Sequence, residues 1–373
     1  MQANRLLIDT LISPETIRQL TIPDWELCIR QARSSQLLTR LAVTIREASL
    51  ENFVPHSVRQ HFIATMAHQA HLRNAIRNEV AYIAEALNSI NVQLVLLKGA
   101  AYELAESMPA RCRTFNDIDL LVPKDRINDV ELSLLIHGWA SIQHDTYDDH
   151  YYRTWMHEIP PLRHLTRHSI IDVHHNIVPD SGPVHLAANK LLANIRPCLS
   201  TQGVFVLSAP DMILHSAVHL FNDGEFDHAL RDLFDIRDLI RQTMVSEADW
   251  QQLISRAQEL GLGRPLYYAL RYIGTVLKEP CAPYLALLSK NAPNRIFLHA
   301  MDNLFTRGLK PEHSSCDDLG TFVARFLLYV RGHALRMPLR LLLPHLARKA
   351  FMQLRDEYFS RRELLTRQSN SRF

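Results

Sequence analysis

One stretch, residues 92–122, constrains the fold of this chain more than any other. It is VQLVLLKGAAYELAESMPARCRTFNDIDLLV, in which an apolar run ends at Lys98-Gly99 and Asp117 and Asp119 lead into a second apolar run. Apolar runs of this length between turn signals predict buried strands. Because side chains alternate between the two faces of a strand, Asp117 and Asp119 point the same way and repel each other. A shared divalent cation is the simplest remedy.

The composition indicates an ordinary, helix-rich protein. Of 373 residues, 47% are apolar and 11 are glycine, and the formal net charge of +2 gives no argument for nucleic-acid binding. The five scattered cysteines lack metal or redox spacing, so we expect free thiols in a reducing cytoplasm. The sequence begins without a signal-peptide pattern and has no run of about 18 apolar residues. We therefore expect a cytoplasmic protein without a transmembrane segment.

Apolar periodicity divides the chain into three parts. Residues 1–90 carry helical patterns throughout and form a helical N-terminal region. Residues 91–180 mix short apolar runs with helical segments, and 151–157 is one of the strands we expect there. Residues 181–373 return to helical patterns. The predicted fold class is α+β, with a small mixed-sheet core embedded between largely helical N- and C-terminal regions.

A third carboxylate comes from a later apolar run, in which Asp172 and His174 share one strand face. If that strand pairs beside the one beginning at Asp117, the carboxylates of Asp117, Asp119 and Asp172 converge. Such a set suits Mg²⁺ or Mn²⁺, because hard cations prefer oxygen ligands and leave positions for water and substrate phosphates. Two divalent ions about 3.5–4 Å apart can clamp a nucleotide's phosphates and activate an attacking hydroxyl. Asp172 would complete the metal on the nucleophile's side.

Lys98, Gly99 and Arg113 are candidates for the phosphate end of this site. Gly99 lets the backbone approach a ligand, and the expected helix after it begins with free N–H groups. Lys98 offers a point charge to phosphate, and Arg113 could contact phosphate or hold a carboxylate. Each element alone has an ordinary alternative, since D-x-D and K-G both occur often in turns. Their order along the chain favours the functional interpretation.

That order resembles the nucleotidyltransferase superfamily of the DNA polymerase β type. More narrowly, it resembles a family of uncharacterised bacterial nucleotidyltransferases whose core reads l-l-K-G, R-x-x-x-D-I-D-L-L-V and D-l-H. The chain matches these elements with Leu96-Leu97-Lys98-Gly99, with Arg113 and Asp117-Ile118-Asp119-Leu120-Leu121-Val122, and with Asp172-Val173-His174. Polymerase-β-type enzymes usually have Gly-Ser where this chain has Lys98-Gly99, which leaves the mode of triphosphate binding open.

The resemblance covers roughly residues 75–245 and implies a metal-dependent enzyme with an NTP substrate. The residues it implies are Asp117, Asp119 and Asp172 for catalysis and metal binding, and Lys98, Gly99, Arg113 and His174 for binding the nucleotide. The implied cofactor is Mg²⁺, or Mn²⁺ in its place.

The C-terminal half offers weaker signals. Arg231 and Asp235 belong to a charged helix that forms either an internal charge network or, together with His219, one wall of the nucleotide cleft. Basic residues outnumber acidic ones between 336 and 373. An amphipathic helix there either packs on its own domain or makes peripheral contact with an anionic membrane or RNA.

Histidines concentrate between His137 and His185, and we interpret them as ordinary surface and core residues rather than as a zinc site. A zinc site needs side chains that converge on one tetrahedron. His174 and His175 are adjacent on an expected strand, so they point to opposite faces.

The sequence thus predicts a cytoplasmic, metal-dependent nucleotidyltransferase. It would move a nucleoside monophosphate from an NTP to an acceptor hydroxyl or phosphate and release pyrophosphate. Two alternatives stay open: a catalytically silent protein that binds nucleotide or a partner on the same fold, and a toxin–antitoxin component that modifies tRNA. The sequence does not identify the acceptor, which could be a small molecule, a protein or RNA. The residues that contact it would lie in the helical regions on either side of the core, where no motif indicates a ligand.

Overall fold

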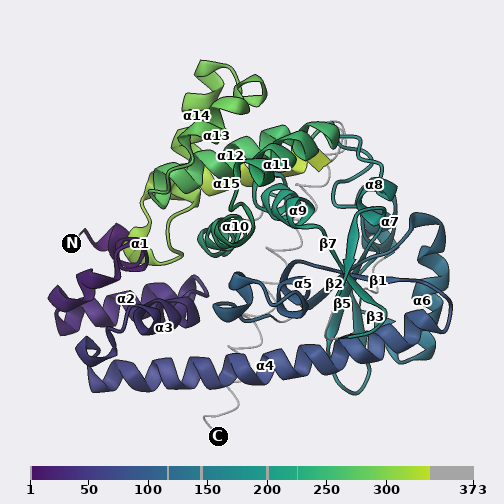
Figure 1. Cartoon of the computed structure of the whole chain (residues 1–373), viewed down its shortest axis with the longest axis horizontal. Helices are drawn as coiled ribbons and strands as arrows, with labels where there is room; N and C mark the ends of the chain where they lie inside the picture. The colour runs from purple at the N-terminus through teal and green to yellow at the C-terminus, as the bar shows by residue number, and fades with distance from the viewer. Residues whose placement is uncertain (1, 116, 143–145, 199–200, 225, 337–373) are drawn as a thin grey trace, which may run out of the picture.

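The computed structural model has a mixed sheet with helices before and after it (Figure 1). The structure describes residues 2–115, 117–142, 146–198, 201–224 and 226–336. Within these residues seven strands form one sheet. The α+β class, with its sheet core between helical regions, is therefore confirmed.

Helices build the part of the chain before the sheet. They are α1 (Leu6–Ile12), α2 (Ile22–Ser34), α3 (Leu38–Glu47) and α4 (His56–Asn88). The helix expected to begin at Ser13-Pro14 is a 3₁₀ helix, Pro14–Gln19. The 33-residue α4 runs beneath both the N-terminal helices and the sheet, and contacts α3 and β1 (Leu94–Leu97) (Figure 1). One continuous helix thus joins the N-terminal region to the sheet.

The sheet has the strand order β3-β4-β5-β2-β1-β7-β6. Its remaining strands are β2 (Asp117–Leu121), β3 (Trp139–Ser141), β4 (Leu162–His164), β5 (Ile170–His174), β6 (Ile195–Pro197) and β7 (Val204–Leu207). The central strand β2 is antiparallel to β1 and parallel to β5. Strands β6 and β7 come from beyond residue 180, so the C-terminal segment also contributes to the sheet.

Short helices connect the strands: α5 (Lys98–Leu104), α6 (Ile127–Ile136), α7 (Thr146–Trp155) and α8 (Asn189–Leu192). The expected strand at 151–157 is wrong, because α7 occupies most of that segment. A helical turn brings Tyr151 and Trp155 into edge-to-face contact, with ring centroids 6.1 Å apart. Both rings belong to a small apolar cluster with Val330 and Ala334 of α15 (Leu319–Arg336). Packing on a distant helix therefore decided the local structure.

The helices after the sheet begin where the sequence signals them at Ser208, whose side chain accepts a hydrogen bond from the Asp211 N–H. They are α9 (Ala209–Asn222), α10 (Ala229–Thr243), α11 (Glu247–Glu259), α12 (Gly263–Val276), α13 (Ala282–Leu287), α14 (Arg295–Gly308) and α15. No helix in the described part of the chain is long and apolar enough to cross a membrane. All five cysteines are free. The basic segment expected beyond Arg336 lies outside the described residues.

A buried ionic contact fixes α10 against the N-terminal region. Arg40 of α3 is 2% exposed and pairs with both Asp235 and Asp238 of α10. The distance from Arg40 Nη2 to Asp235 Oδ1 is 2.8 Å. Removing one partner of a buried pair leaves an uncompensated charge in the interior, which is strongly destabilising.

We predict that Arg40→Met lowers the free energy of unfolding by about 3–5 kcal/mol, because it strips a shared cation from two buried carboxylates. Urea denaturation followed by circular dichroism measures the change. The matched control is Arg30→Met, whose ion pair with Glu26 is exposed on the surface and contributes little. Equal effects of the two substitutions would contradict the prediction.

Candidate active site

The parallel pairing of β2 with β5 brings the three predicted aspartates onto one face of the sheet. Asp119 lies directly beside Asp172 in the register, and alternation along β2 puts Asp117 on the same face. Asp119 is 3% exposed, Asp172 is half-buried and Asp117 is exposed. The three carboxylates therefore differ in burial, from the interior to the surface. They are close enough that the charge of Asp119 raises the pKa of both Asp117 and Asp172.

The buried Asp119 is neutralised by two predicted site residues. Its Oδ1 accepts a hydrogen bond from Lys98 Nζ at 2.9 Å and one from His174 Nε2 at 3.0 Å. Burial alone would raise the pKa of Asp119, but Lys98 and His174 outweigh it and hold that pKa well below its usual range. Asp119 is thus a fixed anion with partners on one oxygen.

Asp172 and Asp117 lack such compensation. Burial, reinforced by Asp119 and Glu158, raises the pKa of Asp172 to about 7. Burial and Asp119 likewise raise the pKa of Asp117. The Oδ1 atom of Asp172 is buried without a hydrogen-bond partner among the described residues. Unbalanced carboxylates with an unpartnered oxygen fit a divalent cation, which would supply the missing positive charge.

The carboxylates of Asp117, Asp119 and Asp172 do not all lie close enough together to bind one cation as they stand. Within the described residues, they do not form a group in which one oxygen from each lies within 4.8 Å of the others. Asp117 is the exposed member, so its side chain has room to rotate. A cation would therefore draw Asp117 inward against the two carboxylates already held by β2 and β5.

The turn between β1 and α5 combines strain with tight packing. Lys98 has φ of +44°, in the left-handed region that non-glycine residues seldom adopt. Gly99 is buried, and a Cβ atom there would lie 2.3 Å from Cδ1 of Phe115. Gly99 therefore has a packing role that the sequence did not reveal, and its expected contact with a ligand stays a prediction. The helix α5 that follows is only seven residues long.

Arg113 holds carboxylates, and its expected contact with phosphate stays a prediction. Its Nη1 atom lies 2.5 Å from Asp235 Oδ2 and 3.3 Å from Asp232 Oδ1, both on α10. These contacts turn the guanidinium toward α10 rather than toward the aspartates of β2. Arg113 still lowers the pKa of Asp117 through its charge, against burial and Asp119, which raise it.

The charged face of α10 has the expected internal network, since Arg231 pairs with Asp232 at 2.8 Å and Arg237 pairs with Asp238 at 2.6 Å. The same face also connects different elements. Asp235 is buried and pairs with Arg113 and with Arg40 of α3, so it is not exposed to a nucleotide. His219 of α9 lies 3.7 Å from Asp232 and 3.6 Å from Asp223. Burial, with help from Lys98, lowers the pKa of His219 to about 4. A neutral His219 thus stands between two acids on the helical side of the site.

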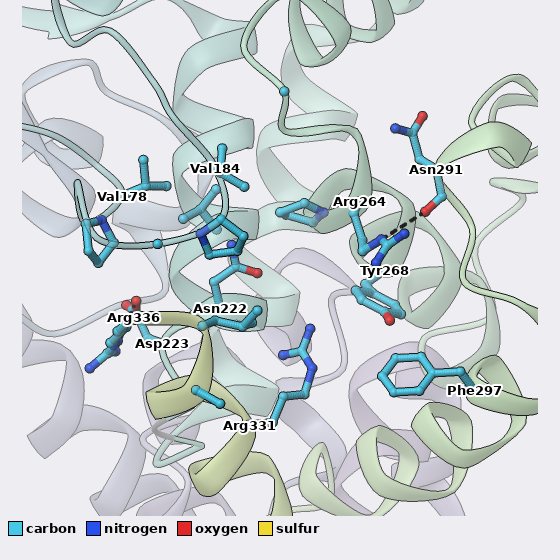
Figure 2. Close-up of a pocket in the computed structure, with 18 residues that line it drawn as sticks. Val178, Val184, Asn222, Asp223, Arg264, Tyr268, Asn291, Phe297, Arg331 and Arg336 are labelled. Atoms are coloured by element: carbon cyan, nitrogen blue, oxygen red, sulfur yellow. Dashed lines mark hydrogen bonds and ion pairs between the residues drawn. The ribbon is translucent and has the colours of Figure 1, made fainter. Parts of the chain in front are cut away.

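A cavity of about 430 Å³ opens on this helical side (Figure 2). Its walls are mainly apolar, and three arginines line it together with Tyr268 and Phe297. Asp223 also lines the cavity, where it pairs with Arg336 at 3.0 Å. The charge of Asp223 also raises the pKa of Lys98, against burial, which lowers it. Asp223 therefore connects the cavity electrostatically to the aspartate site.

Sequence reasoning missed Glu158, His157 and Asp223. His157 ends the segment that was expected to be a strand and Glu158 follows it, so their convergence on β5 had no visible signal. Asp223 ends α9 and carries no motif. Their positions depend on how the C-terminal helices pack on the sheet.

Comparison with known proteins shows the family of this chain. A family model described as "uncharacterised nucleotidyltransferase" matches residues 22–278, more than half of the chain. The chain belongs to this nucleotidyltransferase family. The match runs from the start of α2 to just past α12, so it extends the sequence resemblance on both sides and includes every predicted site residue.

Other comparisons add little to the family assignment. A search of curated proteins finds no match. Among solved structures, an antigenic nucleotidyltransferase-like protein from Paracoccidioides brasiliensis is similar at 14% identity, covering 54% of this chain and 92% of that chain with a TM-score of 0.31.

The raised pKa of Asp172 predicts a pH-dependent stability. Because the folded protein holds this proton up to about pH 7 while an unfolded aspartate loses it near pH 4, the stability contributed by Asp172 declines as pH rises between these values. We predict that Asp172→Asn raises the melting temperature of the EDTA-treated protein at pH 8 by at least about 2 °C, with a smaller gain at pH 5.

Differential scanning fluorimetry at the two pH values checks this. The exposed Asp125→Asn variant is the control and should behave as wild type at both. A destabilised Asp172→Asn variant at pH 8 would show that the carboxylate is not under electrostatic strain.

Proposed function

We propose that this protein is a divalent-metal-dependent nucleotidyltransferase that transfers a nucleoside monophosphate from an NTP to an acceptor. The observation that supports this most is the register of β2 and β5, which sets Asp119 beside Asp172 with Asp117 on the same face. The family match supports the class of reaction. The metal, the nucleotide and the acceptor are our inference.

Asp117, Asp119 and Asp172 are the residues that would hold Mg²⁺, or Mn²⁺ in its place. When bound, such ions neutralise the phosphates and polarise the α-phosphorus for attack. The acceptor oxygen forms a bond to the α-phosphorus, the bond from that phosphorus to the bridging oxygen breaks, and pyrophosphate leaves. Asp172, whose Oδ1 atom is unpartnered, would hold the cation on the acceptor's side. The charge there would lower the pKa of the acceptor hydroxyl, so that its proton passes to solvent water.

Lys98 would change partners during this process. In the free protein its ammonium group neutralises Asp119 at 2.9 Å. Lys98 would be free to turn toward the β- and γ-phosphates if a cation held by Asp119 neutralised that carboxylate in its place. His174, hydrogen-bonded to the same oxygen, keeps the Asp119 carboxylate oriented. Arg113 acts as a positioning residue that holds α10 against the loop before β2.

We assign the acceptor to the cavity beside Asp223. Arg264, Arg331 and Arg336 give its wall positive charge, and Tyr268 and Phe297 give it aromatic surface (Figure 2). A cavity of this kind favours an acceptor with an anionic group and an apolar or planar body. Asp223 lines this cavity, and its charge raises the pKa of Lys98 against burial, which supports a cavity within electrostatic reach of the proposed phosphate site.

One observation favours the catalytically silent alternative. Lys98 and His174 already satisfy Asp119, so a chain that only binds nucleotide would need no metal there. Release of pyrophosphate distinguishes the two functions.

We predict that the wild-type protein binds NTP more tightly with Mn²⁺ or Mg²⁺ than with EDTA, and releases pyrophosphate when a suitable acceptor is supplied. Asp117→Asn should lower turnover by about 100-fold or more, because it removes a charged ligand while leaving the buried carboxylates in place. Labelled NTPs and an acceptor screen measure this, with Asp125→Asn as the control. Absence of metal-dependent nucleotide binding in the wild type would overturn the proposal.

Lys98→Met should move two affinities in opposite directions. Without Lys98 competing for Asp119, Mn²⁺ alone should bind more tightly, while NTP with Mn²⁺ should bind about 10-fold more weakly because a phosphate contact is lost. Isothermal titration calorimetry follows both, and Lys124→Met, which breaks a surface ion pair with Asp180, is the matched control. A loss of both affinities would contradict the exchange of partners.

A further inference from the structure

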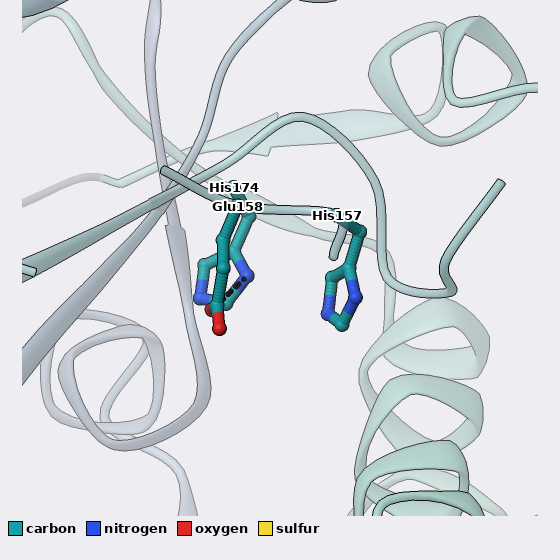
Figure 3. Close-up of side chains that lie close together, drawn as sticks. All are labelled: His157, Glu158 and His174. Atoms are coloured by element: carbon teal, nitrogen blue, oxygen red, sulfur yellow. Dashed lines mark ion pairs between the residues drawn. The ribbon is translucent and has the colours of Figure 1, made fainter. Parts of the chain in front are cut away.

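A compact group of side chains lies beside the aspartates but is not part of them. His157 and Glu158 follow α7, and Glu158 forms an isolated antiparallel bridge with His174 at the end of β5. Each of these three residues has one possible ligand atom within 4.8 Å of a ligand atom of the other two. The three side chains are therefore close enough to share a metal ion. Figure 3 shows the Glu158 carboxylate against the His174 ring, with the His157 ring extending in the same direction beside them.

The two histidines of this group are buried, with His157 7% exposed and His174 2% exposed. The Nδ1 atom of His157 makes no hydrogen bond to any described residue. The Nδ1 atom of His174 lies 3.1 Å from Glu158 Oε2, a contact that needs a proton or a cation between the two atoms. A buried polar atom without a partner is unfavourable and rare in folded proteins, so the Nδ1 atom of His157 indicates a missing ligand.

Hydrogen bonding fixes which nitrogen of His174 is available. Nε2 donates to Asp119 Oδ1 at 3.0 Å, so this nitrogen carries a hydrogen. In the neutral ring Nδ1 then holds a lone pair, and it faces Glu158 Oε2 at 3.1 Å. Two acceptor atoms at this distance repel unless a cation lies between them or the ring is protonated. A histidine that donates its other N–H to a carboxylate is the usual arrangement of a metal-bound histidine.

A proton on His174 would satisfy Glu158 but not His157. The rings of His157 and His174 are stacked, with centroids 5.3 Å apart and planes 29° apart, so a positive charge on one disfavours a positive charge on the other. A buried imidazole whose Nδ1 atom has no hydrogen-bond partner is suited to bind a metal ion.

We propose that His157, Glu158 and His174 form a second divalent-cation site, selective for a transition metal such as Zn²⁺ and separate from the aspartate site. Two imidazole nitrogens and one carboxylate are a ligand set that Zn²⁺ accepts with an open fourth position, whereas Mg²⁺ prefers oxygen ligands throughout. Tetrahedral zinc ligands lie about 3.3 Å apart. Glu158 and His174 are already 3.1 Å apart, and a ligand atom of His157 lies within 4.8 Å of both residues.

The site has a structural consequence for Asp119. A metal on Nδ1 of His174 locks the ring and its tautomer, and through Nε2 it orients the Asp119 carboxylate. The ion binds without nucleotide, so the proposal does not depend on the proposed function and is tested separately from it.

The test measures metal content in the absence of nucleotide. Full-length protein is stripped with EDTA, dialysed against Zn²⁺ in excess Mg²⁺ and analysed by mass spectrometry of the metal, and Co²⁺ substitution gives a visible absorption band if histidine nitrogens bind the ion. We expect one Zn²⁺ per chain that Mg²⁺ does not displace. His157→Gln and Glu158→Gln should each weaken Zn²⁺ binding by at least about 100-fold.

His175→Gln is the matched control, because it changes the neighbouring histidine of the same strand end. It should keep full Zn²⁺ binding, as should Asp117→Asn, which impairs only the aspartate site. Circular dichroism confirms that each variant is folded. The proposal is overturned if wild type binds no Zn²⁺, if Mg²⁺ displaces it, or if His175→Gln loses as much binding as His157→Gln.

Discussion

The pairing of β2 with β5 is the constraint on which the rest of the structure depends. It fixes Asp119 beside Asp172 in a largely buried place, where two carboxylates disfavour each other's ionisation. The two carboxylates are neutralised to different extents. Asp119 receives Lys98 and His174 and remains an anion, while Asp172 receives no comparable partner and its pKa rises to about 7. The site is therefore organised around an electrostatic imbalance that backbone hydrogen bonds hold in place.

Buried acids outside the sheet are also paired with cations. Asp232 and Asp235 of α10 face Arg113, which lies on the chain just before β2, and Asp235 also faces Arg40 of the N-terminal region. Each buried acid is matched with a cation from another element. These pairs connect segments that are far apart in the sequence.

What could be predicted from the sequence was local. Alternation along a strand suffices to put Asp117 and Asp119 on one face, and Asp172 with His174 on another strand's face. The parallel register that joins these strands depends on hydrogen bonds between segments about fifty residues apart, and only the family resemblance suggested it. The partners of Arg113 depend on where α10 packs, and the need for Gly99 depends on the ring of Phe115. Glu158 and His157 were hidden because aromatic packing on α15 turned the preceding segment into a helix.

The length of α4 has a mechanical consequence. A continuous helix of 33 residues is a rod of about 50 Å. The rod carries α3 along one part of its length and β1 along another, so these two elements cannot shift independently of each other. The α10 helix meets this assembly through the pairs that Arg40 and Arg113 form with Asp235. Because these pairs are buried, dissolved salt screens them little, and the junction keeps its strength at high ionic strength.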